Sequence, residues 1–192
     1  MDSSIAAPAP APTASDTAAL RRLYLLRFAF AAVWAALLLA SAHTLNPLST
    51  TLLVIYPACD VACAVVDVRS AKAKRGPVRG LYTNIAFSSL TAAGLVAAAA
   101  SGIPAVLRVW GAWAVTAGLV QLIVGVLRRG MAGQWPMIAS GGISTLAGAS
   151  FVAQAGKGDA SLSSLAGYAF LGGVFFLVSA LRLEQAAKAS GN

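Results

Sequence analysis

The sequence predicts an all-α membrane protein with six transmembrane helices arranged as three repeated antiparallel hairpins. After Leu20 there are six apolar stretches, each with roughly the 20 residues that a helix needs to cross a bilayer. The stretches are 23–42, 48–68, 81–101, 105–127, 135–154 and 161–181. Of the 192 residues, 58% are hydrophobic and 10% are charged, against about 25% charged in soluble domains. This composition excludes an ordinary soluble globule.

Residues 1–19 precede the helical domain and are rich in Ala, Pro, Ser and Thr. Such a segment buries too little apolar surface to offset the entropy of ordering, so we expect a disordered tail. The first apolar stretch ends in the Ala-Ser-Ala at 40–42, the small-x-small pattern of a signal-peptidase site. The stretch is longer than a typical signal core, which favours its retention as the first helix. The transmembrane domain then covers 20–182, and a short cytoplasmic tail covers 183–192.

Basic residues lie in alternate connections between the apolar stretches. Five of them separate the second and third stretches, namely Arg69, Lys72, Lys74, Arg75 and Arg79. The connections after the first and third stretches contain no Lys or Arg. Because Lys and Arg accumulate on the cytoplasmic side, both termini are predicted to lie inside, in a bacterial cytoplasmic membrane. The net charge of +8 then reflects topology and contact with anionic lipid, and it predicts no nucleic-acid partner.

The connections after the first, third and fifth stretches are short, which predicts three antiparallel hairpins. The last two hairpins share a sequence pattern. A Thr-x-x-Gly sequence occurs at 91–94 in the third stretch and again at 145–148 in the fifth. Both hairpins end in Leu-Arg, at 127–128 and 181–182. The first hairpin is a more distant copy. All copies insert in the same direction, which indicates parallel repeats of one hairpin.

Glycines mark the expected contacts between helices, because small residues let membrane helices approach closely. The principal ones are Gly111, Gly118, Gly125, Gly141, Gly148 and Gly173, and Gly142, Gly167 and Gly172 are assigned the same role. Four aromatic residues near span ends are expected to anchor the helices at the interface, namely Trp110, Trp113, Trp135 and Tyr168. Gln121 is expected to donate a hydrogen bond to another helix. Pro57 is expected to kink the second helix.

Polar residues inside the first three spans form the candidate functional site. Counting along the helices at about 1.5 Å per residue places Arg27 at a depth between Asp60 and Asp67. We expect Arg27 to bridge both carboxylates, with Asn84 and Ser88 completing the hydrogen bonds. Two interpretations stay open. The cluster is either a structural tie between helices or a proton- or ion-responsive site, which is the default meaning of an intramembrane carboxylate.

The sequence shows no arrangement typical of catalysis. It contains no Ser/His/Asp pattern, no phosphate-binding loop and no helix with metal-ligand spacing. His43 is the single histidine, and it is predicted to lie on the opposite side of the membrane from the acidic and cysteine side chains. We therefore expect neither an enzyme nor a bound cofactor or metal.

Residues 134–148, QWPMIASGGISTLAG, carry a family resemblance. Their Trp followed by Gly-Ile, Ser and Gly resembles the hairpin start of the HdeD-like acid-resistance membrane protein family. The Gly-Ala-Trp at 111–113 together with Gly118 is similar to that family's second-helix pattern. Members are small multi-pass bacterial inner-membrane proteins, mostly of unknown function. The resemblance implies a link to acid or envelope stress and no established chemistry.

Two functions are therefore predicted. The first is a stress-related inner-membrane protein similar to the HdeD-like family. The alternative is a small proton- or ion-coupled transporter or channel that uses the Arg27, Asp60 and Asp67 cluster. The lipid bilayer is the expected partner, a homo-oligomer is left open, and no protein partner is indicated.

Overall fold

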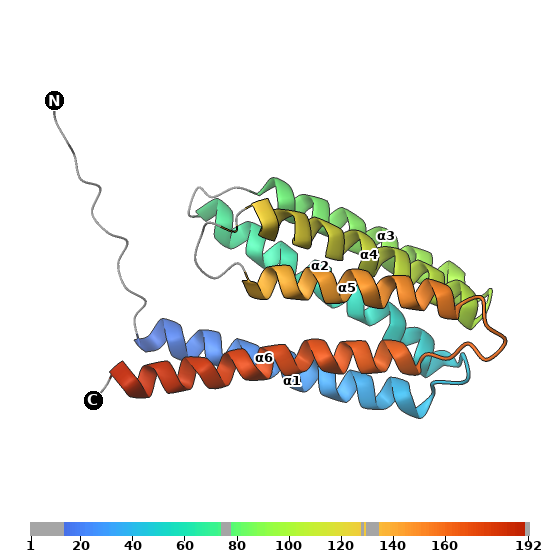
Figure 1. Cartoon of the computed structure of the whole chain (residues 1–192), viewed down its shortest axis with the longest axis horizontal. Coiled ribbons are helices and arrows are strands. Elements are labelled where there is room, and N and C mark those ends of the chain that lie inside the picture. Colours follow the sequence, from blue (N-terminus) through green and yellow to red (C-terminus); the bar gives the residue numbers. More distant parts are fainter. Residues whose placement is uncertain (1–13, 74–77, 128, 130–134, 191–192) are drawn as a thin grey trace. The chain divides into compact units, whose positions relative to one another are not determined.

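The computed structural model describes residues 14–73, 78–127, 129 and 135–190, which form six α-helices and no strand (Figure 1). The helices are α1 (Ala14–Ala40), α2 (Pro47–Ala73), α3 (Arg79–Ala99), α4 (Ile103–Leu127), α5 (Trp135–Gln154) and α6 (Ser163–Ser190). Five of these six are long and apolar enough to cross a membrane, and α5 is the exception. The predicted fold class is confirmed, and the protein is an all-α membrane protein.

Helix ends differ from the prediction at both termini. α1 begins at Ala14, so 14–19 are helical rather than part of a tail. α6 continues to Ser190 through most of the segment predicted as a C-terminal tail. Both extensions are proline-free and contain several alanines, the residue with the highest helix propensity. Residues 1–13 lie outside the described part of the chain.

Two of the short connections have clear local causes. At the start of α2, the Asn46 Oδ1 accepts a hydrogen bond from the Ser49 backbone N–H, and the Ser49 Oγ accepts one from the Asn46 N–H. This reciprocal cap, followed by Pro47 in the first turn, defines where the helix begins. Between α3 and α4 the chain turns at Gly102, whose φ of 93° is costly for a residue with a Cβ.

The chain divides into two compact units, and α1 and α6 each contribute to both. The first unit comprises Met1–Val33 and Ala169–Asn192, and the second comprises Trp34–Tyr168. In the first unit, Arg21 forms an ion pair with Glu184 at 2.9 Å. Further along α1, a Cβ placed on Gly173 would lie 2.9 Å from the Ala31 Cβ. The numbering therefore runs in opposite directions along the two helices, so these portions of α1 and α6 are antiparallel.

In the second unit α2 packs on α3, α3 on α4 and α4 on α5 (Figure 1). The α4–α5 contact brings two backbones together. A Cβ placed on Gly111 would lie 2.6 Å from the Gly148 carbonyl oxygen, and one on Gly141 would lie 2.8 Å from the Gly118 carbonyl oxygen. Gly125 instead faces the Ile138 side chain, whose Cγ1 would lie 2.8 Å from an added Cβ. Real Cβ atoms essentially never approach another atom below 3.0 Å, so a Cβ at Gly111 or Gly141 would force the two backbones apart.

Three further glycines were expected at helix contacts but lie in open space. A Cβ on Gly142, Gly167 or Gly172 would have no neighbour within 4 Å. Gly141 and Gly142 are adjacent in the sequence, yet only Gly141 faces α4. Successive residues on a helix point about 100° apart, so one of two neighbours can face a partner helix while the other faces outward.

Four aromatic residues of the second unit form a cluster around Trp110. Trp110 is fully buried, so it is not the interfacial anchor that its position predicts. Its ring centroid lies 5.6 Å from those of Trp34, Tyr56 and Trp113. The Trp34 Nε1 donates to the Leu52 carbonyl oxygen at 2.7 Å. Trp110 was assigned to the interface from its distance to a helix end, which says nothing about the direction of its side chain.

Candidate functional site

Asp60, Asn84 and Ser88 form a hydrogen-bonded group between α2 and α3. The Asp60 Oδ2 accepts hydrogen bonds from the Asn84 Nδ2 at 2.9 Å and from the Ser88 Oγ at 2.7 Å. Asn84 and Ser88 are four residues apart, which places both on one face of α3. Ser88 is fully buried, whereas Asp60 and Asn84 are half-buried. The structure thus brings together three of the five residues that the sequence places in one cluster.

The structure does not test the positions of the other two members of the predicted cluster relative to Asp60. Arg27 belongs to the first unit, where its guanidinium carbon lies 5.3 Å from the centroid of the Phe176 ring. That distance is typical of a cation–π interaction. The side chain of Asp67 lies outside the described residues. The bridge from Arg27 to Asp60 and Asp67 therefore stays a prediction.

The group around Asp60 is suited to either protonation state of the carboxyl group. Both bonds reach Oδ2, and no hydrogen bond to Oδ1 is found among the described residues of the second unit. In the same part of the chain, no Lys or Arg of this unit forms an ion pair with Asp60. A proton on Oδ1 would leave both bonds to Oδ2 intact, because a neutral carboxyl oxygen still accepts. The two hydrogen bonds are therefore compatible with a charged and with a neutral carboxyl group.

A groove between α3 and α4 adjoins this group. Its volume is about 440 Å³, and Asn84 both lines the groove and donates to Asp60. The wall is mostly apolar, with Phe87 on α3 and Trp113 and Val120 on α4. Sequence reasoning missed the groove, because its shape depends on how far two helices stand apart.

Gln121 also lines the groove and does not behave as predicted. We expected its amide to bond another helix, but no hydrogen-bond partner for it is found among the described residues. The half-buried amide is instead presented to the groove. A polar group in an apolar wall gives the groove one position at which a ligand can be oriented by a hydrogen bond.

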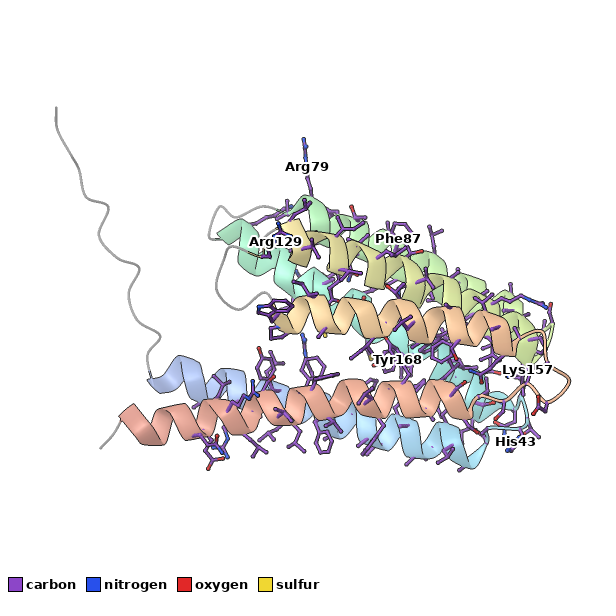
Figure 2. The ribbon with its side chains drawn as sticks, viewed as in Figure 1. His43, Arg79, Phe87, Arg129, Lys157 and Tyr168 are labelled. Carbon is purple, nitrogen blue, oxygen red and sulfur yellow. The ribbon has the colours of Figure 1, made fainter. Side chains whose placement is uncertain are left out.

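A second polar contact joins α5 to α6. The hydroxyl groups of Ser144 and Tyr168 lie 2.8 Å apart, and the Tyr168 ring meets Phe151 edge-on at 5.7 Å. Figure 2 labels Tyr168, which the sequence assigned to interfacial anchoring. Ser144 also belongs to the segment that carries the family resemblance. With Gly141 and Gly148 against α4, all three of these motif residues are engaged in helix packing.

The described residues offer no metal centre. Within 14–73, 78–127, 129 and 135–190, no group of three His, Cys, Asp or Glu side chains could hold a metal ion. Cys59 and Cys63 are free thiols on α2.

The fold and the Asp60 group define a class, a multi-pass all-α membrane protein with a polar site built around one carboxylate. Comparisons of the chain with protein-family models, with curated proteins and with solved structures gave no match. Support for a function therefore comes from the geometry.

Proposed function

We propose that this protein conducts protons across the bacterial cytoplasmic membrane as a small transporter or channel, with both termini in the cytoplasm, and that it works through proton exchange at Asp60. The observation that carries the proposal is the bonding of Asp60. Its carboxyl group, on a membrane helix, is held by two neutral donors, and its other oxygen takes no hydrogen bond from the described residues of its unit. A carboxyl group in this position by default marks function in a membrane protein.

A purely structural tie would not need a charge. An asparagine at position 60 would accept the same two hydrogen bonds through its side-chain oxygen, without an ionisable group at membrane depth. Charged groups in a span are costly, whereas neutral polar pairs serve equally well between membrane helices. The presence of aspartate therefore favours use of its proton over a role in packing alone.

The surroundings of Asp60 support a path for the proton. In the sequence Asp67 follows Asp60 by seven residues, in the direction of the basic connection before α3, and this spacing predicts that both belong to one helical face. Cys63, between them on the same face, is exposed. Under the proposed topology this face leads from Asp60 toward the cytoplasm.

Proton flux into proteoliposomes tests the proposal. We expect the wild-type protein to dissipate an imposed pH gradient, measured with an enclosed pH-sensitive dye. Asp60→Asn should reduce the initial rate at least tenfold, whereas Asp60→Glu should retain part of it. Val66→Ala, which changes an exposed side chain on another face of α2, is the matched control.

Equal reconstitution of each variant must accompany the measurement, judged by gel filtration in detergent. A well-folded Asp60→Asn variant with wild-type flux would contradict the proposal. A wild-type protein that produces no flux above empty vesicles would contradict it as well.

A role in acid or envelope stress is the second proposal, and Asp60 provides an observation in its favour. A membrane carboxyl group that exchanges a proton responds directly to acid, which agrees with what the resemblance of 134–148 implies. A deletion strain complemented with the wild type should survive acid challenge better than one complemented with Asp60→Asn. Equal survival of the deletion strain and its parent would contradict this role.

A further inference from the structure

The groove between α3 and α4 opens toward the surface of its unit, where a membrane protein meets lipid. Phe87 and Val120 line it and remain 45% and 56% exposed. Large apolar side chains with this exposure suit a hydrocarbon surrounding, because lipid tails are as apolar as the side chains themselves. The groove thus offers an apolar surface suited to acyl chains.

The chemistry of the groove changes in a definite order along the helices. At the end where α3 begins and α4 finishes, Arg79 and Arg129 are exposed and labelled in Figure 2; neither lines the groove, but Arg79 is next to the lining residue Gly80. Asn84 follows about 7 Å along α3, and Gln121 lies about 9 Å from the end of α4. Trp113 lies deeper, about 21 Å from the same end. The cations and the two amides therefore lie nearer this end than Trp113 does, in a wall that also contains Val124 and Thr116.

We propose that this groove binds one anionic phospholipid. That order matches the lipid from its phosphate through its ester groups to its acyl chain. Arg79 and Arg129 meet the phosphate, since basic residues at membrane-helix ends attract anionic headgroups. The Gln121 amide, which has no partner among the described residues, donates to an ester carbonyl. The acyl chain lies along Phe87 and Trp113. Charge complementarity selects an anionic lipid over a zwitterionic one.

Native mass spectrometry of the full-length protein in detergent tests the proposal. The probes are phosphatidylglycerol and phosphatidylcholine with identical acyl chains. We expect phosphatidylglycerol to be retained preferentially as a one-to-one adduct. Replacing both basic residues, in Arg79→Gln with Arg129→Gln, should weaken its binding by about fivefold per arginine. Arg108→Gln is the matched control, because Arg108 is an exposed arginine near the opposite end of α4.

A second variant tests the groove itself. Ala117 lines the groove and is exposed, so Ala117→Trp fills the space without entering a packed core. It should reduce the binding of both lipids. Asp60→Asn should leave lipid binding unchanged, which separates this proposal from the proton-coupled function.

Three results would overturn the proposal. Equal retention of the two lipids would remove the anionic preference. An undiminished preference in the double arginine variant would remove the assigned phosphate contacts. The third result is a dimer mass without bound lipid that Ala117→Trp converts to monomer. It would show that a second copy of the chain, rather than a lipid, occupies the groove.

Discussion

The α4–α5 contact and the α2–α3 contact lie in one unit but are held by different means. Between α4 and α5 the backbones meet directly, because Gly118 and Gly141 leave no side chain between them. Between α2 and α3 the contact includes a bond from Ser88 to Asp60. The α4–α5 contact depends on the absence of side-chain atoms at its glycines, whereas the α2–α3 contact depends on the presence of a hydrogen-bond donor and acceptor. Variants that add atoms should therefore damage the first most, and variants that remove hydrogen-bonding groups should damage the second.

The largest effect is expected when a methyl group is added to the α4–α5 contact. A Cβ on Gly141 would lie 2.6 Å from the Leu122 backbone nitrogen, so Gly141→Ala should force the helices apart. Overpacking of this kind costs about 1–3 kcal/mol. We expect a loss near the upper end, measured by reversible unfolding in detergent micelles.

The adjacent glycine is the matched control for this change. Gly142→Ala adds the same methyl group to open space on the same helix. It should leave the free energy of unfolding unchanged or raise it by up to about 1 kcal/mol, because alanine favours the helix. Equal destabilisation by the two variants would show that α4 and α5 do not meet at Gly141.

An intermediate effect is expected when the α2–α3 contact loses its acceptor. Asp60→Leu leaves the Asn84 amide and the buried Ser88 hydroxyl without the oxygen that they bind. A buried polar group without a partner costs about 1–3 kcal/mol. Asp60→Asn keeps an acceptor and should cost less than about 1 kcal/mol. If the two variants unfold with the same free energy, hydrogen bonding does not hold this contact.

The smallest effect is expected at the Ser144–Tyr168 contact. Tyr168→Phe removes one hydroxyl and keeps the ring against Phe151. Hydrogen bonds between membrane helices contribute about 0.6 kcal/mol on average, and we expect a loss of that size. Tyr82→Phe, at a 47% exposed position, should have no measurable effect on unfolding. A loss above about 2 kcal/mol for Tyr168→Phe would exceed the range measured for hydrogen bonds between membrane helices. It would show that close packing, as between α4 and α5, holds this contact.

Some of the candidate site follows from helical spacing along one chain. Asn84 and Ser88 share a face of α3 because they are four residues apart, and both reach the carboxylate on α2. The pairing of Gly111 with Gly148 was not predictable in detail, although both glycines were expected at contacts. Which glycine of a neighbouring pair faces inward depends on how each helix is rotated about its axis. Hydropathy along the chain does not report that rotation.

The sequence alone determined the class of the protein, because the length and apolar character of its stretches decide between lipid and water as the surroundings. It also indicated the small and polar residues from which contacts are built. Only the tertiary structure decided that Trp110 is buried against Trp34 and that Gln121 faces a groove. The physical reason is that a side chain's surroundings depend on the distance and rotation of other helices. Those quantities arise from packing across the whole unit.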